Sequence, residues 1–344
     1  MNPKRRGGFR VERQSAMNRF ACCTFVLLTF LRGPVLADEA RELVRRSLPF
    51  LEQEGVAWMK DRGCASCHQV PAMLWSLNGA VRAGLAVDPQ KLAQWWEWSV
   101  DWKNWVDPKR KVAEPKAIAD NVDTMARLLL GRSAAAKDEA WVPKLRDHLI
   151  ALQDTNGSWK AQGQLPLARR PAREIQEVTT LCVQLALKSA ESPGAPLTNV
   201  HQRASAWVAK GQPGKSTEWW ALRLLLAKAM GSTEEVAAAR GPLLAQQNAD
   251  GGWGWLVGEP SDAFGTGLAL HSLGRSGLTT ANPALQKAVE FLKATQGTNG
   301  SWAVPSTRAQ DNKRIRETSS YWGTAWAALG ILETLPPGED RRGQ

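Results

Sequence analysis

One sequence pattern recurs three times with the same spacing, and it constrains the fold more than any other feature of the chain. The pattern is Leu-x3-Gln-x3-Gly-x-Trp, and its copies occupy residues 149–159, 243–253 and 292–302. Each copy follows a stretch with helical periodicity, so its glycine can supply the positive φ that ends a helix. The tryptophan can then fold back onto the turn. Such a fixed-spacing repeat indicates a chain built from repeated helical units.

A second, more apolar helix is predicted after each turn. Six of these apolar helices are expected, at residues 71–84, 118–130, 173–188, 215–230, 261–273 and 317–332. More polar helices are expected before them, at residues 40–60, 90–104, 139–152, 199–210, 234–246 and 283–294. No segment alternates apolar and polar residues at period two over more than a few positions. The pattern therefore predicts an all-α protein.

Six polar-then-apolar helix pairs can form an open superhelix or a closed (α/α)6 ring. In a ring, the apolar helices form an inner wall and the amphipathic helices face solvent. Small residues such as Gly265, Gly267, Ala325 and Ala328 would let inner helices approach closely, which favours the ring. We expect the toroid to occupy residues 38–335, with a disordered tail at residues 336–344.

The three motif copies resemble the QW repeats of squalene-hopene cyclases. The helix pairs resemble the α/α toroid of terpenoid cyclases and of protein prenyltransferase β-subunits, over about residues 40–335. The resemblance implies the toroid fold. The cyclase acid motif Asp-x-Asp-Asp is absent, since the nearest string, Asp120-Asn121-Val122-Asp123, has another spacing. No Asp-x-Cys pair like the prenyltransferase zinc ligands opens an apolar helix, so the resemblance leaves open whether the protein is an enzyme.

Residues 1–37 are expected to be a signal peptide. Six basic residues precede the apolar run 20–31, and Val35-Leu36-Ala37 fits a cleavage site. Translation could start at Met1 or Met17, and an anchored or amphipathic helix is the alternative. Cleavage would give an exported, periplasmic or cell-envelope protein without stable membrane insertion. It would also remove seven basic residues and one acid, lowering the net charge from +11 to +5. Nucleic-acid binding is therefore not predicted.

The string Cys64-Ala65-Ser66-Cys67-His68 is typical of c-type haem attachment. Cys64 and Cys67 would form thioethers to one porphyrin, and His68 would be an axial iron ligand. Haem attachment in an exported protein agrees with the predicted leader. A zinc site would need two further ligands, and a redox-active disulfide would be expected in a βαβ unit. The string falls where other repeats carry their Gly-x-Trp turn, which by the resemblance lies at the mouth of the central cavity.

The second axial ligand of the iron has two candidates, Met125 and His271. Met73 is too close to His68 in sequence to reach the opposite face of the haem. Methionine and histidine on an apolar helix also occur as ordinary core residues, so the assignment of Met125 stays a hypothesis.

Acidic residues gather where the apolar helices begin. They are Asp120, Asp123, Glu174, Glu177, Glu218, Asp262 and Glu317. Asp120, Asp123, Glu177 and Asp262 are the candidates for catalysis at a cavity mouth, where carboxylates could transfer protons. Capping of helix N-termini is the alternative explanation for the same positions.

Three functions follow as hypotheses. The first is a haem-c electron-transfer protein with a redox partner protein. The second is an enzyme or binding protein for an isoprenoid or another small apolar ligand in the toroid cavity. The third is a non-catalytic scaffold that uses the ring for protein contacts.

Overall fold

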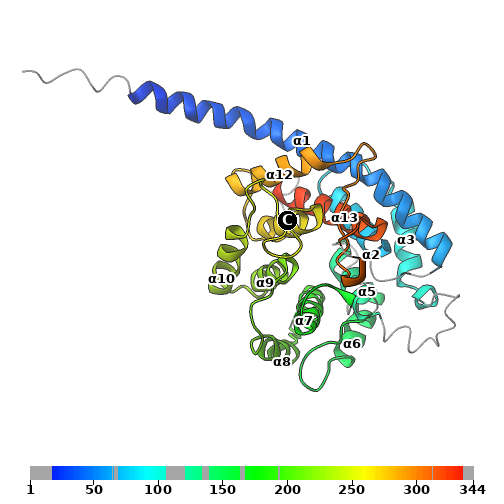
Figure 1. Cartoon of the computed structure of the whole chain (residues 1–344). Helices are drawn as coiled ribbons and strands as arrows, with labels where there is room; N and C mark the ends of the chain where they lie inside the picture. The colour runs from blue at the N-terminus through cyan, green and yellow to red at the C-terminus, as the bar shows by residue number, and fades with distance from the viewer. Residues whose placement is uncertain are drawn as a thin grey trace, which may run out of the picture.

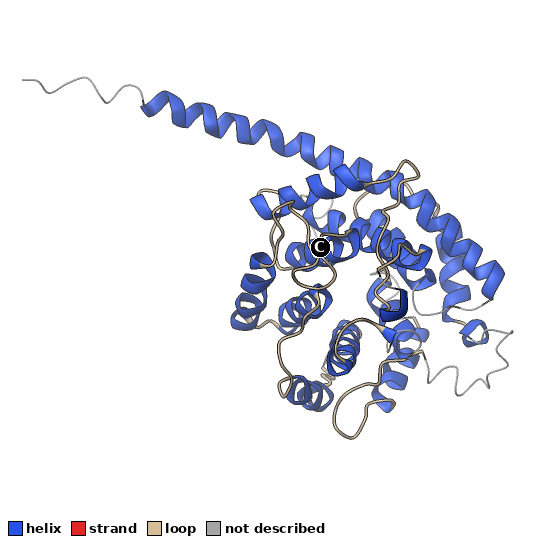
Figure 2. Ribbon diagram, viewed as in Figure 1, coloured by secondary structure: helices blue, strands red, loops and turns tan. Residues whose placement is uncertain are grey.

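The computed structural model describes residues 18–63, 65, 69–105, 121–133, 139–162, 167–192, 194–311 and 313–335, with side chains from Ala37 onward. These residues form twelve α-helices, two short 3-10 helices and isolated β-bridges, with no strand among them (Figure 2). The all-α prediction is confirmed.

Six helices form a closed inner ring (Figure 1). They are α2 (Gln69–Arg82), α5 (Val122–Gly131), α7 (Ala172–Ser189), α9 (Thr217–Met230), α11 (Ala263–Arg275) and α13 (Glu317–Thr334). Each packs against the next in this order, and α13 packs against α2. Most residues of these helices are buried, as the predicted inner wall requires.

Six outer helices precede the inner ones. They are α1 (Asn18–Arg62), α3 (Pro89–Val100), α6 (Trp141–Ala151), α8 (Thr198–Val208), α10 (Thr233–Ala245) and α12 (Pro283–Thr295). Each buries a narrow stripe, for example Leu285, Ala288, Val289 and Leu292 of α12, and exposes the rest. A helix buried on one stripe is amphipathic and suits an outer layer. The predicted (α/α)6 toroid is thus confirmed.

Hydrogen bonds from the glutamine of the repeated motif join each turn to the next outer helix. In the third copy, Nε2 of Gln296 donates to the carbonyls of Gly300 (3.0 Å) and of Leu43 in α1 (2.9 Å). Nε1 of Trp302 donates to the Leu292 carbonyl at 2.8 Å. Gly300 has φ 81°, and a Cβ there would collide with the carbonyl of Arg46. This copy joins the last outer helix to α1 and so closes the outer layer.

The other two copies repeat these bonds. Gln153 and Gln247 donate across to Val200 of α8 and Ala284 of α12. Trp159 and Trp253 donate to the carbonyls ten residues before them. All three motif tryptophans are at most 1% exposed, so the motif is explained by structure alone.

Small residues bring α11 and α13 together. A Cβ on Gly267 would collide with the backbone of Trp326 and Ala327, and Gly330 lies against Gly267. Ala325 and Ala328 are fully buried on the same helix. The close approach predicted from these small residues is confirmed.

Helix α1 runs without interruption from Asn18 through position 37. From Ala37 its side chains pack into the core, beginning with Ala37, Ala40 and Leu43. Within the part of the chain that the structure describes, no helix is long and apolar enough to cross a membrane. Cleavage after Ala37 stays a prediction, and residues 1–17 and 336–344 lie outside the described residues.

Candidate functional site

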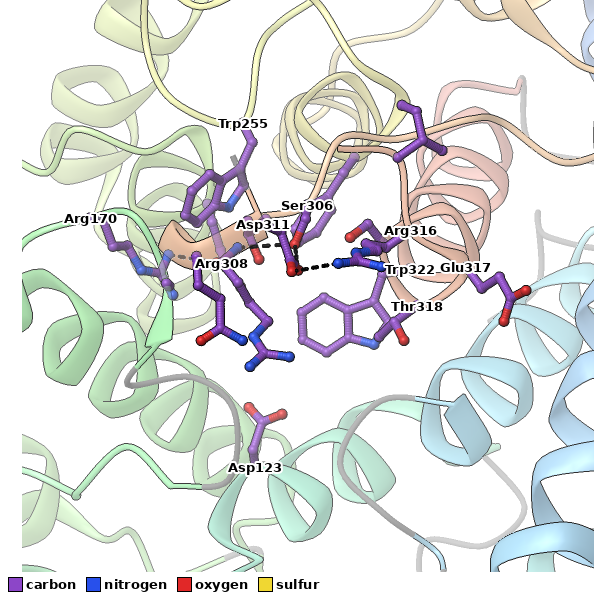
Figure 3. Close-up of a pocket in the computed structure, with 17 residues that line it drawn as sticks. Asp123, Arg170, Trp255, Ser306, Arg308, Asp311, Arg316, Glu317, Thr318 and Trp322 are labelled. Carbon is purple, nitrogen blue, oxygen red and sulfur yellow. Dashed lines mark hydrogen bonds and ion pairs between the residues drawn. The ribbon is translucent and has the colours of Figure 1, made fainter. Parts of the chain in front are cut away.

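The toroid has two distinct ends. The C-terminal residues of all six inner helices line one cavity, for example Arg82 of α2 and Glu333 of α13. The inner helices are therefore parallel, and their N-termini meet at the opposite end. A cavity of about 640 Å³ opens there, which we call the N-terminal cavity. Its lining includes Asp123, Arg170, Glu218, Trp255, Phe264, Arg308, Asp311, Arg316, Glu317 and Trp322 (Figure 3).

Two carboxylates of the N-terminal cavity are held by buried ion pairs. Oδ2 of Asp123 lies 2.7 Å from Nε of Arg127, and both side chains are less than a tenth exposed. The Arg127 guanidinium lies over the Trp322 ring at 4.4 Å. Oε2 of Glu218 lies 2.6 Å from Nη1 of Arg170, which is 1% exposed. Buried charges are tolerated when paired in this way, so both carboxylates are fixed in position at the cavity.

The loop before α13 forms another wall of the N-terminal cavity and is held in place by hydrogen bonds to Asp311. Asp311 accepts hydrogen bonds from the Ser306 hydroxyl (2.7 Å) and from Nη2 of Arg316 (2.9 Å), and these donors lower its pKa. Figure 3 shows Asp123 on the opposite side of the cavity from Arg308 and Trp322. Charged groups of both signs and two indole rings thus surround the space.

The acids expected at this mouth divide into two groups. Asp123, Glu218 and Glu317 line the cavity. Glu174, Glu177 and Asp262 instead hold the backbone or a neighbouring side chain, and Asp120 lies outside the described residues.

The second group has mainly structural contacts. Glu177 accepts from Nε1 of Trp219 at 2.9 Å and pairs with Arg173 at 2.8 Å. Asp262 caps α11 by accepting from the Gly265 amide and also accepts from the Trp255 amide in the preceding loop, while its burial raises its pKa to about 6. Catalytic roles for Glu177 and Asp262 stay hypotheses.

Two residues proposed as haem ligands are core residues of inner helices. Met125 is 0% exposed. His271 lies between the rings of Trp75 and Trp326, with centroids 5.7 and 5.5 Å away, and burial lowers its pKa to about 4. The role of Met125 as an axial ligand stays a prediction.

The turn with the haem-attachment string is fixed at both flanks. Cys64, Ser66, Cys67 and His68 lie outside the described residues. The Ala65 amide donates to the Asn104 carbonyl at 2.5 Å, in the 3-10 helix η1 (Trp102–Trp105). The Tyr321 hydroxyl donates to the carbonyl of Gln69, the first residue of α2, at 3.1 Å. Because Gln69 is the first residue of the inner helix α2, this described flank of the turn lies at the N-terminal end of the ring.

Aromatic rings and buried polar atoms without partners lie beside the described part of this turn. The Trp102 ring of η1 packs edge-on against His148 at 5.3 Å and lies under Nζ of Lys144 at 3.9 Å, and the neighbouring Trp105 is buried. Oε1 of Gln69, Nε1 of Trp102 and Nε2 of His148 are buried without a hydrogen-bond partner among the described residues. Buried polar atoms are normally paired, so these three atoms lack hydrogen bonds that would be expected of them. No three His, Cys, Asp or Glu side chains of the described residues are placed to hold a metal ion.

The chain matches no protein-family model and no curated protein sequence. Solved structures do resemble it. A protein from Actinoplanes has TM-score 0.53 and 14% identity, over 86% of this chain and all of the other. A type II terpene cyclase from Scytonema has TM-score 0.52 and 15% identity, over 87% and 99%. An unsaturated glucuronyl hydrolase mutant from Streptococcus agalactiae has TM-score 0.51 and 11% identity, over 89% and 92%.

The fold is an α/α toroid. At these identities the likenesses show the fold alone, and they agree with the resemblance to terpenoid-cyclase toroids stated from the repeats. Several cavity residues were not foreseen from the sequence, namely Arg170, Trp255, Arg308, Asp311, Arg316 and Trp322. Arg308, Asp311, Arg316 and Trp322 come from one stretch before and at the start of α13, whereas Arg170 and Trp255 come from distant loops. Closure of the ring brings these three segments together, so the spacing within one segment could not reveal the whole cavity.

Proposed function

We propose that the protein carries one covalent haem c on Cys64 and Cys67, with His68 as an axial ligand, and serves in electron transfer or redox chemistry in the cell envelope. The complete Cys-x-x-Cys-His string carries this proposal. The string follows the outer helix α1 directly, and its two flanks are anchored to η1 and α13. The unpaired buried atoms of Gln69, Trp102 and His148 add support.

A bound haem c would supply one-electron chemistry, and axial ligation would tune its potential. The residues of this chain would hold and shield it. Cys64 and Cys67 would anchor the porphyrin edge. Met125 is the proposed second axial ligand because it lies one turn into α5, near the N-terminal end of the ring.

The test is covalent haem after expression with a cytochrome c maturation system. The wild-type protein should give a haem-c pyridine haemochrome spectrum, and the Cys64→Ser/Cys67→Ser variant should give none. Cys182→Ser is the matched control, because Cys182 is a buried thiol in α7, outside the string. His68→Ala should keep the haem covalently bound but change its ligation spectrum. Wild-type protein that folds by circular dichroism and matures without haem would overturn the proposal.

Met125→Ala tests the second ligand separately. If Met125 binds the iron, the substitution should remove the long-wavelength band of methionine-ligated ferric haem and lower the reduction potential. An unchanged spectrum would make Met125 a core residue only.

A second proposal concerns the N-terminal cavity, which we propose binds a polar ligand that contains a ring and an acid group. The motive is the lining, where Asp123, Glu218 and Asp311 face a space shared with arginines and indoles. An apolar chain there would desolvate these charges without compensating them. A sugar acid offers hydroxyls to the carboxylates, a carboxylate to Arg308 and a ring face to Trp322.

The glucuronyl hydrolase among the fold neighbours suggests glucuronic acid as the first probe. Wild-type protein should show saturable quenching of tryptophan fluorescence with glucuronate. Arg308→Gln should weaken binding about tenfold, because a charge-assisted hydrogen bond is lost. Lys293→Gln is the control, since Lys293 pairs with Glu39 on the outer layer. Binding of squalene in place of glucuronate would instead support the apolar-ligand hypothesis, and absence of any ligand would favour the scaffold.

A further inference from the structure

One loop crosses the N-terminal end of the ring from side to side. It comprises residues 305–311 and 313–316, directly before α13, and we call it the strap. In the ring, α7 is the third helix from α13 in either direction, so these two helices lie opposite each other. The strap nevertheless reaches the loop before α7, where the Arg169 amide donates to the Thr307 carbonyl at 2.7 Å. The strap therefore spans the mouth of the N-terminal cavity.

The strap is also a wall of that cavity. Its residues Ser306, Arg308 and Arg316 are among those that line the space. Figure 3 shows Ser306 and Arg308 between Arg170, in the loop before α7, and Arg316, at the start of α13. Arg308 is also the residue proposed above to bind the acid group of a ligand. A molecule that enters the cavity must therefore pass beside the strap.

The strap keeps its shape through bonds of its own. The Ser306 amide donates to the Arg314 carbonyl at 2.8 Å, and Pro305 and Ile315 form a β-bridge. Its buried side chains, Ser306 and Asp311, are polar, whereas Ile315 is 55% exposed. A segment that buries little apolar surface opens at a lower free-energy cost than a packed core. The strap can thus separate from the opposite side of the ring as one unit.

Glu259 holds the strap to that opposite side. This residue lies in the loop before α11 and accepts two hydrogen bonds from Arg169, at 2.8 and 3.1 Å. Its Oε1 also lies 2.8 Å from Nζ of Lys313 in the strap. The hydrogen bonds from Arg169 and Lys313 lower the pKa of Glu259, so its carboxylate is ionised near neutral pH. One carboxylate therefore joins the loops before α7, α11 and α13.

We propose that the strap is a size-selective gate to the N-terminal cavity and that Glu259 is the latch that keeps it closed. With the latch closed, a single small ring can pass beside the strap. A bulkier molecule enters only when the strap moves away from Arg169 and Glu259. This inference rests on the proposed ligand site, but its test needs no ligand.

A cysteine inside the cavity measures access directly. Thr318 lines the cavity in the first turn of α13 and is half-buried. The full-length Thr318→Cys protein is labelled with a small thiol reagent, methyl methanethiosulfonate, and with a bulky one, fluorescein maleimide. Wild-type protein gives the background from the native cysteines. Adding Glu259→Gln should speed the bulky reagent about fivefold, because two ion pairs of the latch are lost, and the small reagent by less than about twofold.

Two further variants separate the latch from a general effect of charge. Lys313→Gln removes the contact of the strap to Glu259 but leaves Arg169 in place, so it should speed the bulky reagent by only about twofold. Glu39→Gln is the matched control, because Glu39 also pairs with a lysine, Lys293, but lies on the outer layer. It should leave the labelling rates of both reagents unchanged.

Hydrogen exchange locates the movement. In Glu259→Gln the Arg169 amide, which bonds across the mouth, should exchange about fivefold faster, whereas the Ser306 amide within the strap should not change. Equal acceleration of both reagents, an unchanged rate for the bulky reagent, or unchanged exchange at Arg169 would overturn the proposal. Glucuronate binding is measured separately. Its absence alongside size-dependent labelling would reject the proposed ligand and still support the gate.

Discussion

The last and the first turns of the toroid occupy equivalent places in the repeat but differ in what their residues do. In the last turn, Gln296, Asn299 and Trp302 all form hydrogen bonds that fix the chain. The first turn has no glutamine, glycine and tryptophan in these places. Its flanks are held from outside, by the carbonyl of Asn104 and the hydroxyl of Tyr321.

This difference bears on which residues serve the fold and which serve a function. Where side chains of a turn make the bonds that define its shape, substitution should cost stability. In the first turn, the contacts that the structure describes come from neighbouring segments. The proposed haem attachment predicts that its cysteines and histidine serve chemistry, so their substitution should affect the haem more than stability.

Trp302→Ala, in the last turn, should produce the largest loss of stability. The indole is 1% exposed and donates to the Leu292 carbonyl. Its removal should lower the free energy of unfolding by about 3–5 kcal/mol, from lost burial and the cavity left behind. Urea denaturation monitored by circular dichroism measures this.

Trp98→Ala is the control, because Trp98 is only half-buried on the outer helix α3. It should lose clearly less stability than Trp302→Ala. Covalent haem should be retained in both variants below their melting temperatures. A loss below ~1 kcal/mol for Trp302→Ala would contradict the structural role of the motif.

The fold could be predicted from the sequence because its signals are local. The motif combines a helix end, a glycine and a tryptophan within eleven residues, so its spacing survives in every copy. The apolar helix predicted at 317–332 is observed as Glu317–Thr334, and that predicted at 173–188 as Ala172–Ser189. The small residues of α11 and α13 are also a local signal, and they indicated that these two helices pack closely.

The cavities could not be predicted in the same way. Whether an acid at a helix start faces a cavity or caps the helix depends on the rotation of that helix in the ring. Asp123 and Asp262 both lie where an inner helix begins, yet Asp123 is inside the first turn of α5 and lines the N-terminal cavity, whereas Asp262 is the N-cap of α11 and holds two amides. The cations at the C-terminal ends of five inner helices, such as Arg82 and Arg275, are likewise gathered around one cavity only by the closed ring.

Gln296→Ala should produce an intermediate loss of stability and test the contact between α12 and α1, which closes the outer layer. Gln296 joins the last outer helix to Leu43 of α1, whereas Gln247 makes the same bond between helices close in sequence, to Ala284. Each alanine variant should lose about 1–3 kcal/mol, because two carbonyls lose a partner. If Gln296→Ala melts like wild type while Gln247→Ala does not, the contact between the last outer helix and α1 contributes little to the stability of the ring.

Tyr321→Phe should give the smallest loss of stability and examines the first turn itself. The hydroxyl lies 3.1 Å from the carbonyls of Leu51 and Gln69, and the ring is 2% exposed. Phenylalanine keeps the packing, so the free energy of unfolding should fall by only about 0.5–1.5 kcal/mol. Burial raises the pKa of Tyr321 well above its usual value, so the hydroxyl stays protonated and the loss should not vary around neutral pH.

The informative readout of Tyr321→Phe is the haem. Gln69 directly follows His68, so release of its carbonyl should shift the spectrum or the potential of a haem held by His68. Trp302→Ala, in a turn without haem ligands, should leave both unchanged. A stability loss in Tyr321→Phe as large as that in Trp302→Ala, with no spectral change, would show that the first turn is as structural as the last. The contrast between the two turns would then no longer support haem attachment.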